Sequence, residues 1–148
     1  MKRSTFILIL KILAAVAGAI VATLTAQSCS LTSELTKTKT GIDNIPNVSQ
    51  TNDLRILCRD ILEPLRDKIG KPIIINSAFR SVAVNRAVGG VSNSLHLLGQ
   101  AADIHCNSLT AFELYKAIDN LVLEGQFDIG QCILYKNSHF VHVSRPIS

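Results

Sequence analysis

The sequence has no tryptophan, and aromatic residues make up only 5% of its 148 residues. Its formal net charge of +4 does not come from a basic patch in a folded domain, because Lys2, Arg3 and Lys11 all lie near the N-terminus. Without residues 1–28, 12 basic residues face 11 acidic ones, which leaves a net charge of +1. No basic run with interleaved aromatic residues remains, so the sequence argues against a nucleic-acid partner.

Cysteine is also scarce, and its positions share no spacing typical of a metal-binding motif. The four cysteines are Cys29, Cys58, Cys106 and Cys132. If Cys29 carries a lipid, three thiols remain and at least one of them must be free. Cys58 falls among expected helix-core positions and Cys132 in a β-like run, so both are predicted to be buried structural cysteines. A disulfide between two cysteines stays open, and the sequence does not select the pair.

No internal repeat is present, and 47% hydrophobic with 18% charged residues is the composition of a globular protein. A chain of this length has room for one domain besides its N-terminal segment. Residues 29–50 are rich in Ser, Thr and Asn without a steady period, which predicts a tether. We therefore expect a targeting segment at residues 1–28, then this tether, and a folded domain at residues 51–148.

The N-terminal segment is typical of an exported protein. A positively charged start is followed by the apolar residues 12–26, and small residues precede Cys29. This order defines a signal peptide, and residues 26–29 (AQSC) loosely resemble the site at which bacterial lipoproteins are cut and acylated on cysteine. Cys29 is therefore a candidate lipidation site; an uncleaved membrane anchor and simple secretion are the alternatives. All three place the domain outside the cytoplasm, and the first two attach it to the membrane in the cell envelope.

Residue periodicity predicts an α+β domain. Helical spacing predicts three helices, at residues 52–69, 81–88 and 108–123. Thr51 or Asn52 is the expected N-cap of the first helix and Ser108 that of the third, while Pro64 predicts a kink in the first. Short β-rich runs predict four strands, at residues 72–75, 101–106, 131–135 and 140–143. We expect a small, antiparallel-leaning sheet packed with helices.

Two stretches place metal-competent side chains where a strand would otherwise carry apolar ones. Residues 94–104 hold His96 and Asp103, and residues 140–144 hold His142. A glycine between His96 and Asp103 permits a turn, and His142 lies in an alternating run that can face the same point from a neighbouring strand. Two imidazoles and one carboxylate suit Zn²⁺, and three protein ligands with an open position are typical of a catalytic site. Hydrogen-bonded core histidines are the commoner alternative, and spacing alone does not exclude them.

These stretches resemble the motifs of the bacterial zinc D-alanyl-D-alanine carboxypeptidase family, which also contains phage endolysins that cut peptidoglycan peptides. Residues 94–104 (SLHLLGQAADI) are similar to its first metal motif and residues 141–144 (VHVS) to its second. Residues 75–81 (INSAFRS), with the asparagine and glycines that follow, resemble the segment that bears its substrate-binding arginine. Residues 41–44 and 62–66 are similar to the start of its peptidase domain. The resemblance implies the small fold of the hedgehog/DD-peptidase type.

The resemblance also implies a zinc peptidase domain at residues 51–148. Zinc would be held by His96, Asp103 and His142, where it would activate water and polarise the scissile carbonyl. Arg80 would be both catalytic and substrate-binding, holding the substrate carboxylate or the tetrahedral oxyanion. A surface arginine that caps a helix end is the alternative for Arg80.

Ser94 and Gln131 are further candidates for substrate binding. Ser94 would bind the peptide backbone or orient a metal ligand, with a simple turn role as the alternative. Gln131 would contact substrate from its strand, with a structural hydrogen bond as the alternative. His105 is left out of the metal set, because it is expected to point to the opposite side of the strand from Asp103.

His139 stands where many members of that family carry an acidic residue as general base. A histidine can act as a base near neutral pH, so His139 is the predicted catalytic base. If His139 is only a solvated turn residue, Glu124 and Asp128 are more distant candidates.

Two functions follow from the resemblance. The first is a zinc metallopeptidase that hydrolyses peptidoglycan stem peptides, as a D-alanyl-D-alanine carboxypeptidase or an endopeptidase. The alternative is an envelope-tethered, zinc-containing module that binds cell-wall peptides without cutting them. Both have peptidoglycan peptides and, through the N-terminus, the membrane as partners.

Overall fold

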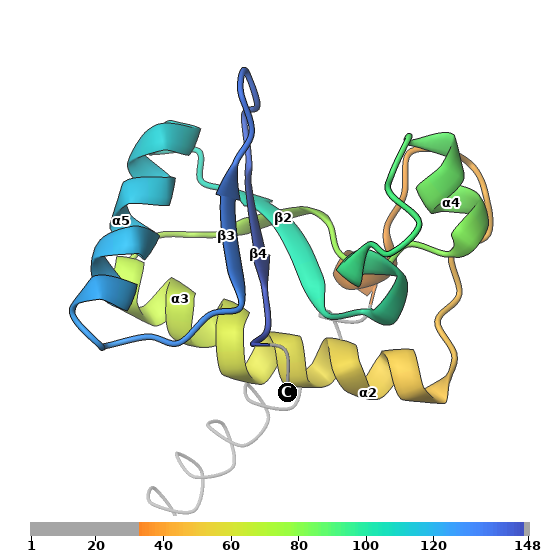
Figure 1. Cartoon of the computed structure of the whole chain (residues 1–148), viewed down its shortest axis with the longest axis horizontal. Coiled ribbons are helices and arrows are strands. Elements are labelled where there is room, and N and C mark those ends of the chain that lie inside the picture. Colours follow the sequence, from red (N-terminus) through yellow and green to blue (C-terminus); the bar gives the residue numbers. More distant parts are fainter. Residues whose placement is uncertain (1–32, 147–148) are drawn as a thin grey trace, which may run out of the picture. The chain divides into compact units, whose positions relative to one another are not determined.

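A computed structural model describes residues 33–146, and within them four antiparallel strands form one sheet in the order β1-β2-β4-β3 (Figure 1). The strands are β1 (Ile74–Ser77), β2 (Ala101–His105), β3 (Gln131–Leu134) and β4 (Val141–Ser144). The helices are α2 (Val48–Leu57), the π-helix η1 (Cys58–Leu62), α3 (Glu63–Ile69), α4 (Val82–Ala87), the 3₁₀-helix η2 (Leu95–Leu98) and α5 (Ala111–Leu123). The predicted α+β class is confirmed.

The first predicted helix forms as α2, η1 and α3 in direct succession. Its N-cap is Asn47, whose side chain bonds the backbone of Gln50 in a reciprocal capping box, so the expected cap at residue 51 or 52 is wrong. Pro64 lies in the first turn of α3, and the π-helical turn η1 comes directly before it. A proline lacks the N–H that an unbroken helix needs, and a π-turn is one way to absorb that loss. Gly70, in the left-handed conformation with φ 66°, ends α3.

Alternation along the two central strands separates an apolar face from a polar one. The side chains of Ala102 and Ile104 in β2 and of Val141 and Val143 in β4 are fully buried. They belong to the core together with apolar residues of the helices, among them Leu54, Leu57, Ile61, Leu62, Leu65, Leu114 and Ile118. Successive strand residues point to opposite faces. The residues between these apolar ones, which include Asp103 and His142, therefore lie on the other face of the sheet.

The N-cap of α5 is Thr110, not Ser108 as predicted from the sequence. The Thr110 hydroxyl accepts a hydrogen bond from the backbone of Glu113, whose carboxylate bonds the Thr110 backbone in return. The Ser108 hydroxyl instead lies 3.3 Å from the Cys106 thiol. A Thr-x-x-Glu capping box satisfies two helix-end donors at once, which a lone serine does not.

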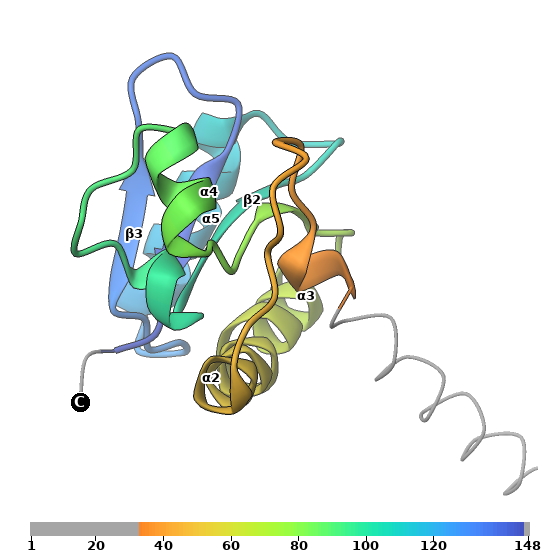
Figure 2. The same cartoon turned by 90° about the vertical axis from the view of Figure 1, so that its right-hand side faces the viewer.

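The folded unit begins at Glu34, so the domain boundary predicted at residue 51 lies too late. Leu35 is only 2% exposed, and its carbonyl accepts a hydrogen bond from the Phe79 backbone. The side chain of Asn44 donates to the carbonyls of Thr36 and Phe79 at 2.8 Å each. Figure 2 shows this segment, in orange, running beside the rest of the folded unit before it turns into α2. Polar composition alone suggested a tether, but two buried side chains fix the segment in place.

Cys58, Cys106 and Cys132 are free thiols. Burial raises the pKa of both Cys58 and Cys132 to about 11, so both are protonated near neutral pH. The predicted burial is confirmed for Cys58, whereas Cys132 is half-buried. Cys29 and the predicted targeting segment, residues 1–28, lie outside the described residues. In residues 33–146 no helix combines the length and the apolar character that crossing a membrane requires.

Candidate metal centre

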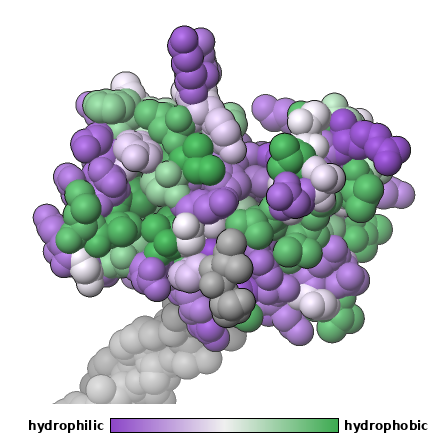
Figure 3. Space-filling view, viewed as in Figure 1, coloured by the Kyte–Doolittle hydropathy of each residue, from purple (hydrophilic) through white to green (hydrophobic). Residues whose placement is uncertain are grey.

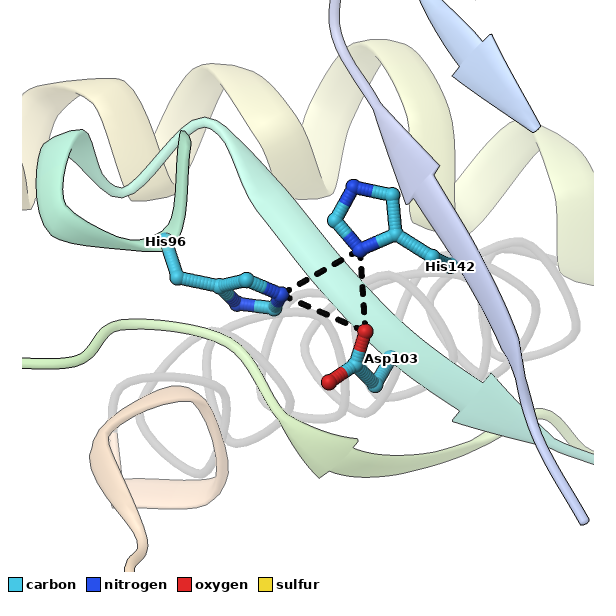
Figure 4. Close-up of side chains that lie close together, drawn as sticks. All are labelled: His96, Asp103 and His142. Atoms are coloured by element: carbon cyan, nitrogen blue, oxygen red, sulfur yellow. Dashed lines mark hydrogen bonds and ion pairs between the residues drawn. The ribbon is translucent and has the colours of Figure 1, made fainter. Parts of the chain in front are cut away.

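Three side chains from separate elements converge on the polar face of the sheet. His96 comes from η2, Asp103 from β2 and His142 from β4 (Figure 4). His142 Nδ1 lies 2.9 Å from Asp103 Oδ1, and His96 Nε2 lies 3.2 Å from each of these atoms. All three residues are buried, with 2% to 6% of their surface exposed. The sequence-based expectation that these residues meet at one point agrees with the structure.

The sheet register and one tight turn bring the three residues together. Asp103 and His142 are direct partners across the β2–β4 ladder, so their side chains leave the same face side by side. Gly99 follows η2 with φ 73°, and a Cβ there would lie 2.8 Å from the Gln50 carbonyl oxygen. Only glycine combines this backbone angle with so close an approach. The turn at Gly99 reverses the chain, so that His96 lies over the strand that carries Asp103.

The hydrogen bonds fix which nitrogen each histidine presents. His96 Nδ1 lies 2.6 Å from the Ala78 carbonyl oxygen, which can only accept, so Nδ1 carries the proton and Nε2 faces the centre as an acceptor. His142 presents Nδ1 to the same point. Two ring nitrogens and a carboxylate oxygen within 2.9–3.2 Å of one another form a dense group of acceptors. A divalent cation satisfies such a donor set, and the backbone carbonyl behind His96 is the usual orienting partner of a metal-binding histidine.

Asp103 uses its two oxygens for different partners. Oδ1 faces the histidines, while Oδ2 forms an ion pair with Arg80 Nη2. Arg80 Nε also donates to the Ser77 hydroxyl at 2.9 Å. Burial raises the pKa of Asp103, but the contacts with His142 and His96 and the positive charge of Arg80 outweigh it and hold that pKa well below its usual range. The carboxyl group is therefore ionised, as a metal ligand must be.

An open cavity of about 650 Å³ lies over the three residues. Its walls include Tyr135 and Phe140 from the β3–β4 turn, residues 88–91 after α4, Ser94 and Lys39. The space-filling view shows a hollow between the protruding β3–β4 turn and the α4 region (Figure 3). The metal-competent groups thus lie at the floor of a cavity that is large enough for a peptide.

Asn85 lies behind the wall of this cavity that Gly90 and Val91 form. The Asn85 side chain donates to the Val91 carbonyl at 2.9 Å, and its backbone carbonyl accepts from Gly90 at 2.8 Å. A Cβ on Gly90 would lie 2.1 Å from Asn85 Oδ1, so only glycine fits beside this buried asparagine. The sequence indicated this pair only through its resemblance to the family motif.

The other predicted site residues divide into two groups. Arg80 and Ser94 line the cavity, as expected. Gln131 is exposed, pairs with Ser144 at the start of β3, and is not among the cavity residues. His139 is also exposed, and it lines a separate pocket of about 560 Å³ between the β3–β4 turn and the start of α5. The structure therefore does not bring His139 to the metal-competent residues, and its role as general base stays a prediction.

His105 is not part of the centre, but the reason given from the sequence is wrong. Residues two apart in a strand share a face, so His105 lies on the same side of β2 as Asp103. It lies two residues after Asp103 in β2, where its Nδ1 is 2.5 Å from Asn76 Oδ1. Sequence reasoning also missed Lys39 and Tyr135, because the first lies in the expected tether and the second in a run identified only as a strand.

A buried pair of histidines with one carboxylate, on an antiparallel sheet and beneath an open cavity, is a ligand set that suits a single metal ion in a small α+β domain. The family model described as Peptidase M15 matches residues 24–144, and the chain belongs to the peptidase M15 family. The chain is also similar to the zinc D-Ala-D-Ala carboxypeptidase of Streptomyces albus G, with 45% identity over 60 residues. This similarity covers 40% of the chain and 24% of that protein, so the match spans about a quarter of the relative's length. These findings confirm the family that the sequence motifs indicated.

Proposed function

We propose that the chain is a zinc metallopeptidase that hydrolyses peptidoglycan stem peptides, as a D-alanyl-D-alanine carboxypeptidase or an endopeptidase. The observation that carries the proposal is the convergence of His96, Asp103 and His142 at the floor of an open cavity. Membership of the peptidase M15 family and the similarity to a zinc D-Ala-D-Ala carboxypeptidase support the same reaction class.

Some residues of the site are candidate metal ligands, and others orient those ligands. His96 Nε2, His142 Nδ1 and Asp103 Oδ1 would hold the zinc ion, and the Ala78 carbonyl fixes the orientation of the first imidazole. Zinc in such a site supplies Lewis acidity toward the peptide carbonyl and toward water at neutral pH. Burial of all three side chains excludes bulk water from the ligands themselves.

Arg80 has a more specific role than the sequence suggested. Its Nη2 and Nε are engaged by Asp103 and Ser77, so its first task is to hold the carboxylate ligand in place. The remaining nitrogen, Nη1, is available to donate to a substrate oxygen. A planar guanidinium performs both tasks at once, since its donors diverge in fixed directions.

A module that binds wall peptides without cutting them is the second candidate, and one observation favours it. Asp103 is the only carboxylate among the described residues that line the cavity, and it is committed to the centre. His139, the predicted base, lies in the neighbouring pocket. A peptidase needs a group that accepts a proton from water, whereas a binding module does not.

The test is hydrolysis of synthetic stem peptides that end in D-Ala-D-Ala, followed by detection of the released amine. The purified protein should carry about one zinc per chain, release D-alanine or an internal amine, lose activity with a chelator and regain it with zinc. His142→Ala is the matched inactive control. Zinc binding without hydrolysis of any wall peptide would establish the binding module, and a protein that takes up no zinc after reconstitution would overturn both candidates.

We propose further that Cys29 is acylated and attaches the domain to the membrane in the cell envelope. The charged start, the apolar run and the small residues before Cys29 support this. A fatty-acid analogue should label the wild type but not Cys29→Ser. Equal labelling of both proteins, or a mature protein that retains Met1, would instead indicate an uncleaved anchor.

A further inference from the structure

Lys39 lies on the wall of the cavity over the metal-competent residues. It belongs to residues 34–46, part of the stretch 29–50 whose composition suggested a tether, and neither the motifs nor the family match assigns it a role. Its side chain is exposed, as a group that meets a ligand from solvent must be.

The segment that carries Lys39 is attached to the domain on both sides of it. On one side, the Leu35 carbonyl accepts a hydrogen bond from the Phe79 backbone. On the other, the Asn44 side-chain oxygen accepts from the Ser81 backbone at 2.7 Å. Since Phe79 and Ser81 flank Arg80, the segment is attached to the same stretch of chain that carries a site residue.

A local turn sets the conformation at Lys39 itself. The hydroxyls of Thr38 and Thr40 lie 3.0 Å apart, and the Thr40 backbone donates to the Thr38 hydroxyl at 3.2 Å. The Ile42 backbone then donates to the Thr40 hydroxyl at 3.3 Å. Such side-chain to backbone bonds are typical of ordered turns. Lys39 therefore stands on a defined turn at the cavity rim.

Among the described residues, none of the charged groups around the cavity pairs with Lys39. Arg80, the other lysine or arginine on its walls, is paired with Asp103. Lys39 forms no ion pair with any residue of the described range 33–146. A cavity with one unpaired ammonium group, next to a centre suited to a cation, favours an anionic ligand group.

We propose that Lys39 forms the binding site for the free C-terminal carboxylate of the peptide substrate. This rests on the proposed peptidase function and deepens it, because a site for a terminal carboxylate makes the chain a carboxypeptidase rather than an endopeptidase. Lys39 is suited to this role since Arg80 is held by Asp103 and Ser77. An ammonium group on a flexible stem accommodates a carboxylate without requiring one fixed geometry.

The test compares two peptides that differ only in charge at the end: an N-acylated peptide ending in D-Ala-D-Ala as the free acid, and its C-terminal amide. In the wild type the acid should be the better substrate. Lys39→Ala should lower kcat/KM for the acid about 10-fold more than for the amide, mainly through KM, which is the scale of one charge-assisted hydrogen bond. Lys39→Arg should restore most of the preference.

Lys37→Ala is the matched control, because Lys37 is an exposed lysine of the same segment that does not line the cavity. It should keep the acid-to-amide ratio of the wild type. Thermal unfolding of each variant shows whether the domain is intact. An unchanged ratio in Lys39→Ala, or the same loss in Lys37→Ala, overturns the proposal.

Peptide binding, measured by calorimetry, separates this proposal from the proposed function. If the wild type cleaves neither peptide, the carboxypeptidase activity fails, and Lys39 is then judged by affinity alone. Tighter binding of the acid than of the amide, with the difference lost in Lys39→Ala, supports the carboxylate site without catalysis. Equal affinity for the two peptides in the wild type overturns it.

Discussion

At the scale of single residues, the geometry of the candidate metal centre depends on the partner that each polar atom of Asp103 and His96 has. Asp103 divides its oxygens between Arg80 and the two histidines, and His96 divides its nitrogens between the Ala78 carbonyl and the centre. No polar atom of these residues is buried without a partner. A change at one residue therefore has separable effects on metal binding, ligand orientation and folding.

Replacing one ligand should remove the metal while leaving the fold. His142→Ala is expected to reduce bound zinc from about one per chain to a small fraction, since two remaining ligands hold zinc weakly. The domain should still fold, because the apolar residues on the other face of β4 are unchanged. Elemental analysis measures the zinc and circular dichroism the fold. His105→Ala is the control, and loss of zinc in that variant would contradict the ligand set.

Replacing Arg80 should impair turnover more than metal binding. Arg80→Lys keeps the positive charge but loses the paired donors that engage Asp103 and Ser77. We expect zinc affinity to fall by about 10-fold, as for other residues that orient a metal ligand. The rate should fall by about 100-fold, the scale of one lost transition-state donor. Competition with a chelator measures the first and steady-state kinetics the second. Wild-type kinetics in this variant would remove Arg80 from the site.

At the scale of an element, the start of α5 shows why Thr110 rather than Ser108 is the N-cap of the helix. Ser108 and Thr110 both have hydroxyls, but only Thr110 has a glutamate three residues later that completes the capping box. Thr110→Ala should lower the free energy of unfolding by about 1 kcal/mol, the usual cost of losing an N-cap. Ser108→Ala should change it by less than about 0.5 kcal/mol. Urea unfolding of both variants measures the difference, and the reverse order would move the cap back to Ser108.

At the scale of the whole molecule, the segment before α2 is part of the folded unit rather than a leader to it. Leu35 is 2% exposed, whereas Ile45, ten residues on, is 81% exposed. Leu35→Ala should lower the free energy of unfolding by about 2–4 kcal/mol, as is typical when a buried leucine is truncated. Ile45→Ala should cost less than about 0.5 kcal/mol. Equal effects of the two substitutions, measured by urea unfolding, would show that the segment does not pack as described.

Local patterns in the sequence predicted most of the elements, although not η2, and the resemblance to a family indicated the candidate metal ligands. Alternating apolar residues gave β2 and β4, helical spacing gave α2–α3 and α5, and the motifs around His96, Asp103 and His142 named the three residues that converge. These features depend on neighbours within a few positions, where backbone geometry fixes which side chains share a face. The same regularity should have placed His105 on the side of Asp103.

Only the tertiary structure decided which residues from distant segments share the cavity. Lys39 lines the cavity because Leu35 and Asn44 form hydrogen bonds to Phe79. His139 does not line it, because the β3–β4 turn places that residue in another pocket. Arg80 and Asp103, 23 positions apart, pair where a shift in the β1–β2 register sets Ser77 opposite Asp103. Such contacts depend on how elements pack rather than on local spacing. For that reason the sequence indicated the candidate metal ligands, whereas only the fold determined which residues surround them.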